Sequence, residues 1–253
     1  MSLHYDVSAG AGCALEPKGS ATVLAQYIQD TASQRWPHEQ RPVVVELGAG
    51  VGLVGLTAAA CCGANVVLTE WCRGGNQAQL ELLEWNVLEN NRLIQASGGS
   101  AAAVEFDWSS SQAHAPAVFT AISTNATSAD AGGAATDAGS SSSLLVVGSD
   151  ISYDVDTIPP LLTSIKLLLS RDGVDGDAST AVARSGARMK SSPPPSPSTA
   201  TWSPPYPSAL LAYTKKRSSY ANEFLLAKAK AAGLHTRVAE TRGLTEILEL
   251  RLG

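Results

Sequence analysis

The chain has 253 residues, of which 44% are hydrophobic and 16% are charged, so it can close a sizeable core and is not a wholly disordered protein. Eighteen basic residues against 23 acidic ones give a net charge of −5, which disfavours a nucleic-acid-binding surface. The uncharged stretch between Glu46 and Glu70 is long enough to cross a bilayer, but its five glycines predict turns, so we expect no membrane span.

The first half of the chain alternates helix-like and strand-like segments. Helical spacing of apolar residues predicts a first helix with Val23, Leu24, Tyr27 and Ile28 on its buried face. Short apolar runs rich in valine predict buried strands. The predicted elements are helices at 20–36, 53–62 and 76–90, and strands at 43–47, 66–69 and 103–106.

The alternation continues to the end of the chain. A strand at 144–148, a helix at 157–170, a strand at 210–213 and a helix at 219–232 precede two final strands at 235–240 and 246–252. No helix separates these last strands, which indicates a hairpin. We therefore predict an α/β, Rossmann-like fold with seven strands, a mostly parallel sheet and a C-terminal antiparallel hairpin.

Two stretches break this pattern. Residues 109–143 are rich in Ser, Ala, Thr and Gly, and residues 171–208 contain the run SSPPPSPSTATWSPPYPS. Neither has the periodic apolar residues that would offset the entropy of ordering it. We predict a single domain over residues 1–253, with low-complexity loop insertions at 109–143 and 171–208.

A predicted strand runs into a glycine-rich turn in the sequence VVVELGAGVG. Such a turn before a helix lets bare backbone N–H groups approach a ligand closely. Gly50, Gly52 and Gly55 fit the dinucleotide pattern GxGxxG, and Glu70 follows where a ribose-binding acid is expected. Glu46 favours a different cofactor, because an acid inside the strand suits a ligand with an ammonium group, such as S-adenosylmethionine.

Several sequence blocks occur together in a fixed order along the chain. They are VVVELGAGVGLVGL (43–56), VVLTEW (66–71), LELLEWNVLENN (80–91), EFDW (105–108), VVGSDISYD (146–154), IPPLLTSIKLLL (158–169) and LLAYTKKR (210–217). In these blocks the chain resembles the seven-strand class I methyltransferases, and specifically the protein lysine methyltransferases related to the human methyltransferase-like 21 group. The resemblance covers nearly all of the residues predicted to be structured.

The resemblance implies S-adenosyl-L-methionine as the cofactor and no metal. It assigns the methionine and ribose portions to Glu46, Gly48, Ala49 and Gly50, the ribose hydroxyls to Glu70, the adenine to Asp107 and Trp108, and cofactor entry to Ser149. Trp108 has the alternative of an ordinary core aromatic, and for Trp85 we predict that core role.

The residues after the fourth strand are candidates for the methyl-acceptor site, because ligands of open α/β sheets gather outside the carboxyl ends of the strands. Asp150 and Tyr153 match the family's D-x-x-Y motif, which implies catalytic roles. Asp150 can orient an amine, and Tyr153 can supply an aromatic wall and a hydroxyl. Loop capping is the alternative for Asp150, and for Asp154 and Asp156 we predict capping of the next helix.

Two features depart from this pattern. The segment SPPY at 203–206 resembles a motif of methyltransferases that modify nucleic-acid amines, but that motif belongs directly after the fourth strand, where this chain has DISY. Lys18 stands where the family usually carries a tryptophan near the cofactor.

The resemblance implies a protein-lysine N-methyltransferase whose partner is a protein substrate, with no nucleic acid and no membrane. Methylation of another side chain or a small molecule stays open, as do an NAD(P)-dependent oxidoreductase and a non-catalytic cofactor-binding module. Cys13, Cys61, Cys62 and Cys72 form no CxxC pair, which favours a reducing compartment, the cytoplasm, with the nucleus as an alternative. We interpret Cys61 and Cys62 as core residues.

Overall fold

The computed structural model describes residues 19–36, 42–72, 74, 77–129, 144–170, 207–215 and 219–253. The position of Lys18, the SPPY segment at 203–206, and residues 130–143 and 171–206 of the two predicted loops lie outside the described residues.

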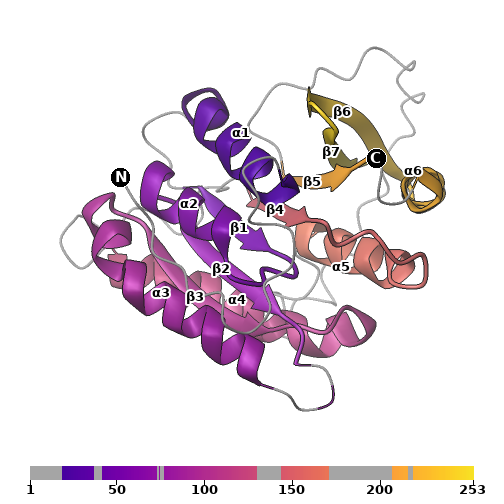
Figure 1. The fold of residues 1–253 in the computed structure, drawn as a ribbon. Coiled ribbons are helices and arrows are strands. Elements are labelled where there is room, and N and C mark those ends of the chain that lie inside the picture. Colours follow the sequence, from indigo (N-terminus) through magenta and orange to yellow (C-terminus); the bar gives the residue numbers. More distant parts are fainter. Residues whose placement is uncertain are drawn as a thin grey trace, which may run out of the picture.

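Seven strands form one sheet in the order β3-β2-β1-β4-β5-β7-β6 (Figure 1). Strands β1 to β5 pair in parallel, whereas β7 pairs antiparallel with both β5 and β6. This confirms the predicted mostly parallel sheet with a C-terminal antiparallel hairpin. The strands are β1 (Val43–Glu46), β2 (Asn65–Glu70), β3 (Ser100–Glu105), β4 (Leu144–Ser149), β5 (Ser208–Thr214), β6 (Leu234–Arg242) and β7 (Thr245–Leu252).

Helices cover both faces of the sheet (Figure 1). They are α1 (Ser20–Arg35), α2 (Leu53–Cys62), α3 (Ala78–Ala96), α4 (Ser111–Ala129), α5 (Ile158–Ser170) and α6 (Ser219–Ala231). Val44 and Val66 pack with α1, α2 and α3, while Val45 and Val67 pack with α4, α5 and α6. Successive strand residues point to opposite faces, so these strands must be apolar at every position. Within the described part of the chain, no helix has the length and apolar character needed to span a bilayer.

The strand order places a switch point at β1. From β1 the chain builds outward through β2 to β3, and then returns to β4 on the other side of β1. The parallel strands end at one common edge of the sheet, and loops that diverge at a switch point leave room there for a ligand. The candidate site is therefore expected where β1 and β4 end.

The prediction of a loop over residues 109–143 is wrong for residues 109–129, which are helical. A short 3-10 helix (Trp108–Ser110) leads into α4, which buries Ala115, Val118 and Phe119 against the sheet. These three positions have helical spacing, but Ser, Ala and Thr surround them, so the apolar periodicity is weak. Packing against the sheet stabilises α4, rather than local sequence preference.

Two side chains predicted to be in the core are exposed. Helix α3 buries the face that carries Leu83, Asn86 and Asn90, and Trp85 lies on the other side of the helix with 53% of its surface exposed. Cys61 is exposed in the last turn of α2, whereas Cys62 is half-buried.

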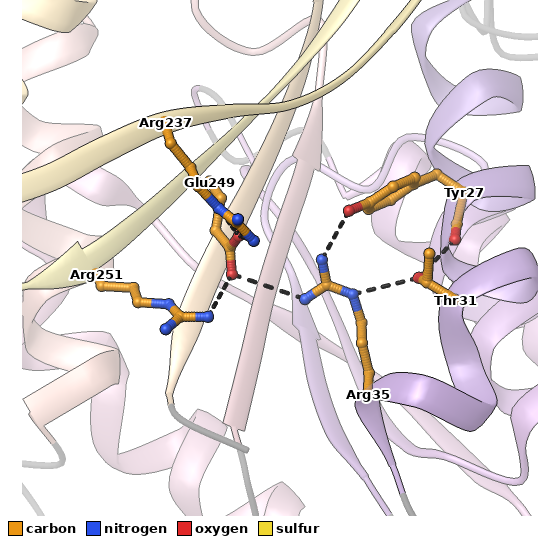
Figure 2. Close-up of polar contacts among 6 residues, drawn as sticks. All are labelled: Tyr27, Thr31, Arg35, Arg237, Glu249 and Arg251. Atoms are coloured by element: carbon orange, nitrogen blue, oxygen red, sulfur yellow. Dashed lines mark hydrogen bonds and ion pairs between the residues drawn. The ribbon is translucent and has the colours of Figure 1, made fainter. Parts of the chain in front are cut away.

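A buried carboxylate joins α1 to the β6–β7 hairpin (Figure 2). Glu249 accepts hydrogen bonds from Arg237 Nε at 2.7 Å and Arg251 Nη2 at 2.9 Å, and Arg35 Nη1 of α1 lies 3.8 Å away. Arg35 also donates from Nη2 to the Tyr27 hydroxyl at 2.9 Å. Glu249 pairs with Leu210 near the start of β5, so this network lies away from the carboxyl edge of the sheet.

Candidate active site

The turn after β1 depends on left-handed backbone at Gly48, Gly50 and Gly52, whose φ angles are +60°, +57° and +83°. A Cβ atom on Gly48 would stand 2.9 Å from Ile151 Cγ2 and 3.4 Å from a ring carbon of Trp108. At Gly50, by contrast, none of the described residues other than its two chain neighbours has an atom within 4 Å of that position, and Gly50 is exposed. The turn is therefore packed tightly at Gly48 and accessible at Gly50.

Neighbouring strands hold this turn. Leu47 N–H donates to the Val147 carbonyl of β4 at 2.8 Å, and Ala49 N–H donates to the Thr69 carbonyl of β2 at 2.8 Å. The Thr69 hydroxyl donates in return to the Glu46 carbonyl at 2.8 Å. Strands on both sides of β1 thus determine the path of the backbone before the open glycine.

Glu46 ends β1 with a buried carboxyl group that faces the first turn of α2. Its Oε2 accepts the Gly55 N–H at 2.7 Å. Burial raises the pKa of Glu46 to about 8, and the nearby Glu70 charge adds to this effect, while the N–H groups of Gly55 and Val54 oppose it. The Glu46 carboxyl group therefore supports the start of α2, a role that the sequence did not predict.

Glu70 ends β2 beside the open side of the turn. Its Oε2 accepts the Gly50 N–H at 2.7 Å, and its Oε1 accepts the Trp71 N–H at 3.1 Å. Burial raises the pKa of Glu70, and these two N–H groups lower it. Each carboxylate oxygen has a second lone pair, so Glu70 retains the capacity to accept hydroxyl groups from a ligand.

The segment after β3 reaches the same turn. Trp108 is half-buried, packs against the hydrophobic cluster under α4 and α5, and lies next to Gly48. Asp107 Oδ1 accepts the Ser109 N–H at 2.8 Å and caps the short 3-10 helix. Trp108 thus makes the core contact that the sequence analysis gave as one alternative, and it also lies beside the glycine turn.

The segment after β4 begins with an unusual backbone. Among the described residues, Asp150 is the one non-glycine residue with a positive φ, at +52°, and its N–H donates to the Ala212 carbonyl of β5 at 2.9 Å. Left-handed backbone costs energy for a residue with a side chain, although Asp tolerates it better than most. Such strain concentrates at functional sites. Ser149, directly before it, is half-buried and pairs with Ala212.

The rest of this segment is partly anchored and partly exposed. Ile151 is buried against Gly48 and Gly148, which ties the β4 loop to the glycine turn. Tyr153 is 71% exposed. Asp154 Oδ1 accepts the Asp156 N–H at 3.0 Å, a contact within the loop before α5, which begins at Ile158, and not the predicted cap on that helix.

The structure brings the predicted site residues to the ends of four adjacent strands. Asp107 and Trp108 follow β3, Glu70 ends β2, the glycine turn follows β1, and Ser149 and Asp150 lie at the end of β4. The exposed backbone of Gly50 beside the acidic side chain of Glu70 fits a ligand with a ribose and a charged amino acid portion, as S-adenosylmethionine has.

Sequence reasoning missed two residues at this site. Ile151 joins the two loops, and Asn86 of α3 donates from Nδ2 to the Val51 carbonyl at 3.1 Å. A polar residue on the apolar face of an amphipathic helix was the available signal for Asn86.

Comparison with known proteins shows a match to one family model and a similarity of fold to solved structures. The family model described as lysine methyltransferase matches residues 1–118. No curated protein matches the sequence. Among solved structures, the rRNA methyltransferase AviRa from Streptomyces viridochromogenes is 13% identical with a TM-score of 0.50, and the comparison covers 98% of this chain and 88% of that one.

Two further structures match less well. The ribosomal protein L11 methylase from Lactobacillus delbrueckii subsp. bulgaricus is 12% identical with a TM-score of 0.42, over 92% of this chain and 78% of that one. The human methyltransferase 10 domain containing protein is 9% identical with a TM-score of 0.46, over 93% and 83% of the two chains.

The residues matched by the family model include β1, the glycine turn, Glu70 and Trp108, and they end before Asp150. AviRa shares the fold at an identity too low to indicate a common substrate. These findings confirm the resemblance to the seven-strand lysine methyltransferase family, and the protein is an S-adenosylmethionine-dependent methyltransferase.

Proposed function

We propose that the protein transfers a methyl group to the side-chain amine of a lysine in another protein. The observation that carries this proposal is the match of residues 1–118 to the family model described as lysine methyltransferase. The D-x-x-Y sequence at Asp150–Tyr153 supports it, since it follows β4 as the family pattern requires.

In this proposal the carboxyl edge of β1, β2 and β3 holds the cofactor. Gly50 offers an accessible backbone, and Glu70 beside it accepts the ribose hydroxyls. Bound S-adenosylmethionine supplies a methyl group on a positively charged sulfur. The remaining cofactor contacts are assigned to Glu46, Gly48, Ala49, Asp107, Trp108 and Ser149.

The acceptor side is assigned to the loop after β4. Asp150 attracts the incoming ammonium and orients the amine after its proton is lost, because only a neutral amine has the lone pair needed for attack. The hydrogen bond from the Asp150 N–H to the Ala212 carbonyl supports this role, since it fixes the backbone that carries the carboxylate. Tyr153 is exposed enough to meet a side chain that arrives from a partner protein.

The test is to incubate the protein with labelled S-adenosylmethionine and a cell lysate, and to identify the labelled product by mass spectrometry. We expect the label on lysine. Asp150→Asn keeps the shape and tolerates the left-handed backbone, so transfer falls by about tenfold to a thousandfold while the affinity for S-adenosylhomocysteine changes little.

Asp154→Asn is the matched control, because Asp154 lies in the same loop and makes a local backbone contact. It should keep its activity per folded molecule. Label found on RNA or on a small molecule would contradict the lysine proposal. Full activity in Asp150→Asn would remove Asp150 from the acceptor site.

A further inference from the structure

Helix α3 contributes a buried amide group to the glycine turn. Asn86 is fully buried, and its Nδ2 donates to the Val51 carbonyl at 3.1 Å. Leu83, one helical turn earlier, lies so close that a Cβ atom on Gly52 would stand 2.8 Å from its Cδ1. Helix α3 is therefore in direct contact with the turn, although the turn itself lies between β1 and α2.

The hydrogen bond from Asn86 satisfies the Val51 carbonyl, a backbone group just before α2 that accepts no hydrogen bond from the helix itself. If α2 extended one residue further toward its start, the Gly55 N–H would donate to the Val51 carbonyl four residues before it. Instead, the Gly55 N–H donates to Glu46 Oε2 at 2.7 Å, and the first helical bond runs from Leu56 N–H to the Gly52 carbonyl at 2.9 Å. Glu46 thus accepts the Gly55 N–H, and Asn86 donates to the Val51 carbonyl. These two backbone groups would bond to each other if α2 began one residue earlier.

We propose that Asn86 is a positioning residue that holds the glycine turn in its cofactor-binding conformation. Without its amide, the Val51 carbonyl would lose this donor, and the Gly55 N–H could satisfy it only by leaving Glu46. That exchange would extend α2 by one residue into the turn and shift the backbone beside Gly50. The inference rests on the assignment of this turn to the cofactor, and it is independent of the methyl acceptor.

The chain offers a closely matched control. Asn90 is also fully buried on the same face of α3, one turn further along, but its side-chain Nδ2 donates to the backbone carbonyl of Asn86 at 2.8 Å, a bond within α3. Removing Asn90 therefore perturbs helix packing without removing the amide that contacts the turn.

The experiment compares Asn86→Ala and Asn90→Ala by calorimetry with S-adenosylhomocysteine, well below the melting temperature of both variants. Asn86→Ala should weaken binding about tenfold, which corresponds to about 1.4 kcal/mol. It should raise KM for S-adenosylmethionine by a similar factor, with kcat changed less. Asn90→Ala should lower the melting temperature and keep the affinity within about twofold. Amides of residues 47–56 should exchange hydrogen faster in Asn86→Ala alone.

Three results would overturn the proposal. Asn86→Ala could bind with wild-type affinity, Asn90→Ala could weaken binding equally, or the exchange of residues 47–56 could be unchanged. If Asn86→Ala does not fold, Asn86→Ser is judged by the same criteria. Failure of the wild-type protein to bind S-adenosylhomocysteine would instead refute the cofactor assignment on which the inference rests.

Discussion

Glu46→Gln tests whether the Glu46 carboxyl group is neutral in the folded protein at pH 7. Glutamine has the same shape, and its amide oxygen can still accept the Gly55 N–H. The substitution removes the ability to ionise and replaces one carboxyl oxygen with an NH2 group, a change that does not itself depend on pH between 4.5 and 8. We therefore expect Glu46→Gln to become more stable than the wild-type protein as the pH rises from 4.5 to 8.

The magnitude follows from the pKa of Glu46, which burial raises from 4.5 to about 8. Above pH 4.5 the unfolded chain releases this proton, whereas the folded protein keeps it until about pH 8. The folded state then binds more protons, so the stability of the wild-type protein falls as the pH rises, by about 1.4 kcal/mol for each pH unit. Relative to the variant, the loss reaches roughly 3 kcal/mol at pH 7 and levels off above pH 8.

The assay is urea unfolding of both proteins at pH values from 4.5 to 8.5, followed by tryptophan fluorescence. Glu249→Gln is the control, because Glu249 is equally buried but contacts Arg35, Arg237 and Arg251 (Figure 2). It should be destabilised across this range. A stability difference between Glu46→Gln and wild type that stays constant with pH would refute the reasoning.

The raised pKa of Glu46 also predicts that cofactor binding releases protons. If Glu46 pairs with the ammonium group of the bound cofactor, it must ionise, so binding at pH 7 releases about one proton. Calorimetry with S-adenosylhomocysteine in phosphate and in Tris measures this number, because the two buffers take up protons with different enthalpies. No proton release would leave Glu46 as a support for α2 and remove it from the ligand contacts.

Three further predictions concern other parts of the chain. Glu70→Ala should weaken S-adenosylhomocysteine binding by about 1.5 to 3 kcal/mol, the range for hydrogen bonds to a charged group, and unchanged affinity by calorimetry would contradict the ribose assignment. Glu249→Gln should lower the free energy of unfolding by about 3 to 5 kcal/mol, because three arginines lose their shared carboxylate, and urea unfolding measures it. Phe119→Ala should cost about 3 kcal/mol or more in the same assay, since Phe119 packs in the core; a silent change would argue against a packed α4.

The apolar runs at 43–47, 66–69 and 144–148 were sufficient to predict buried parallel strands. A strand covered by helices on both faces must be apolar at successive positions, and that pattern is visible without neighbours. The glycine turn was predictable for a similar reason, because backbone with positive φ demands particular residues. The order of these local signals along the chain also indicated the family.

Helix α4 and the exposure of Trp85 depended on tertiary structure. Helix α4 has few apolar residues among its Ser, Ala and Thr, and the sheet provides the surface that stabilises it. Trp85 is as hydrophobic as a core residue, and only the packing of α3 on its other face leaves it exposed.

The contacts that Asn86 and Glu46 make around the glycine turn likewise depend on the tertiary structure. Asn86 lies 35 positions from Val51, and no local pattern connects the two. The buried Glu46 looked like a ligand contact from its position in β1, yet its carboxyl group also accepts the Gly55 N–H of α2. Local sequence determines which backbone conformations are possible, whereas a buried donor or acceptor takes whichever partner the folded chain brings within reach.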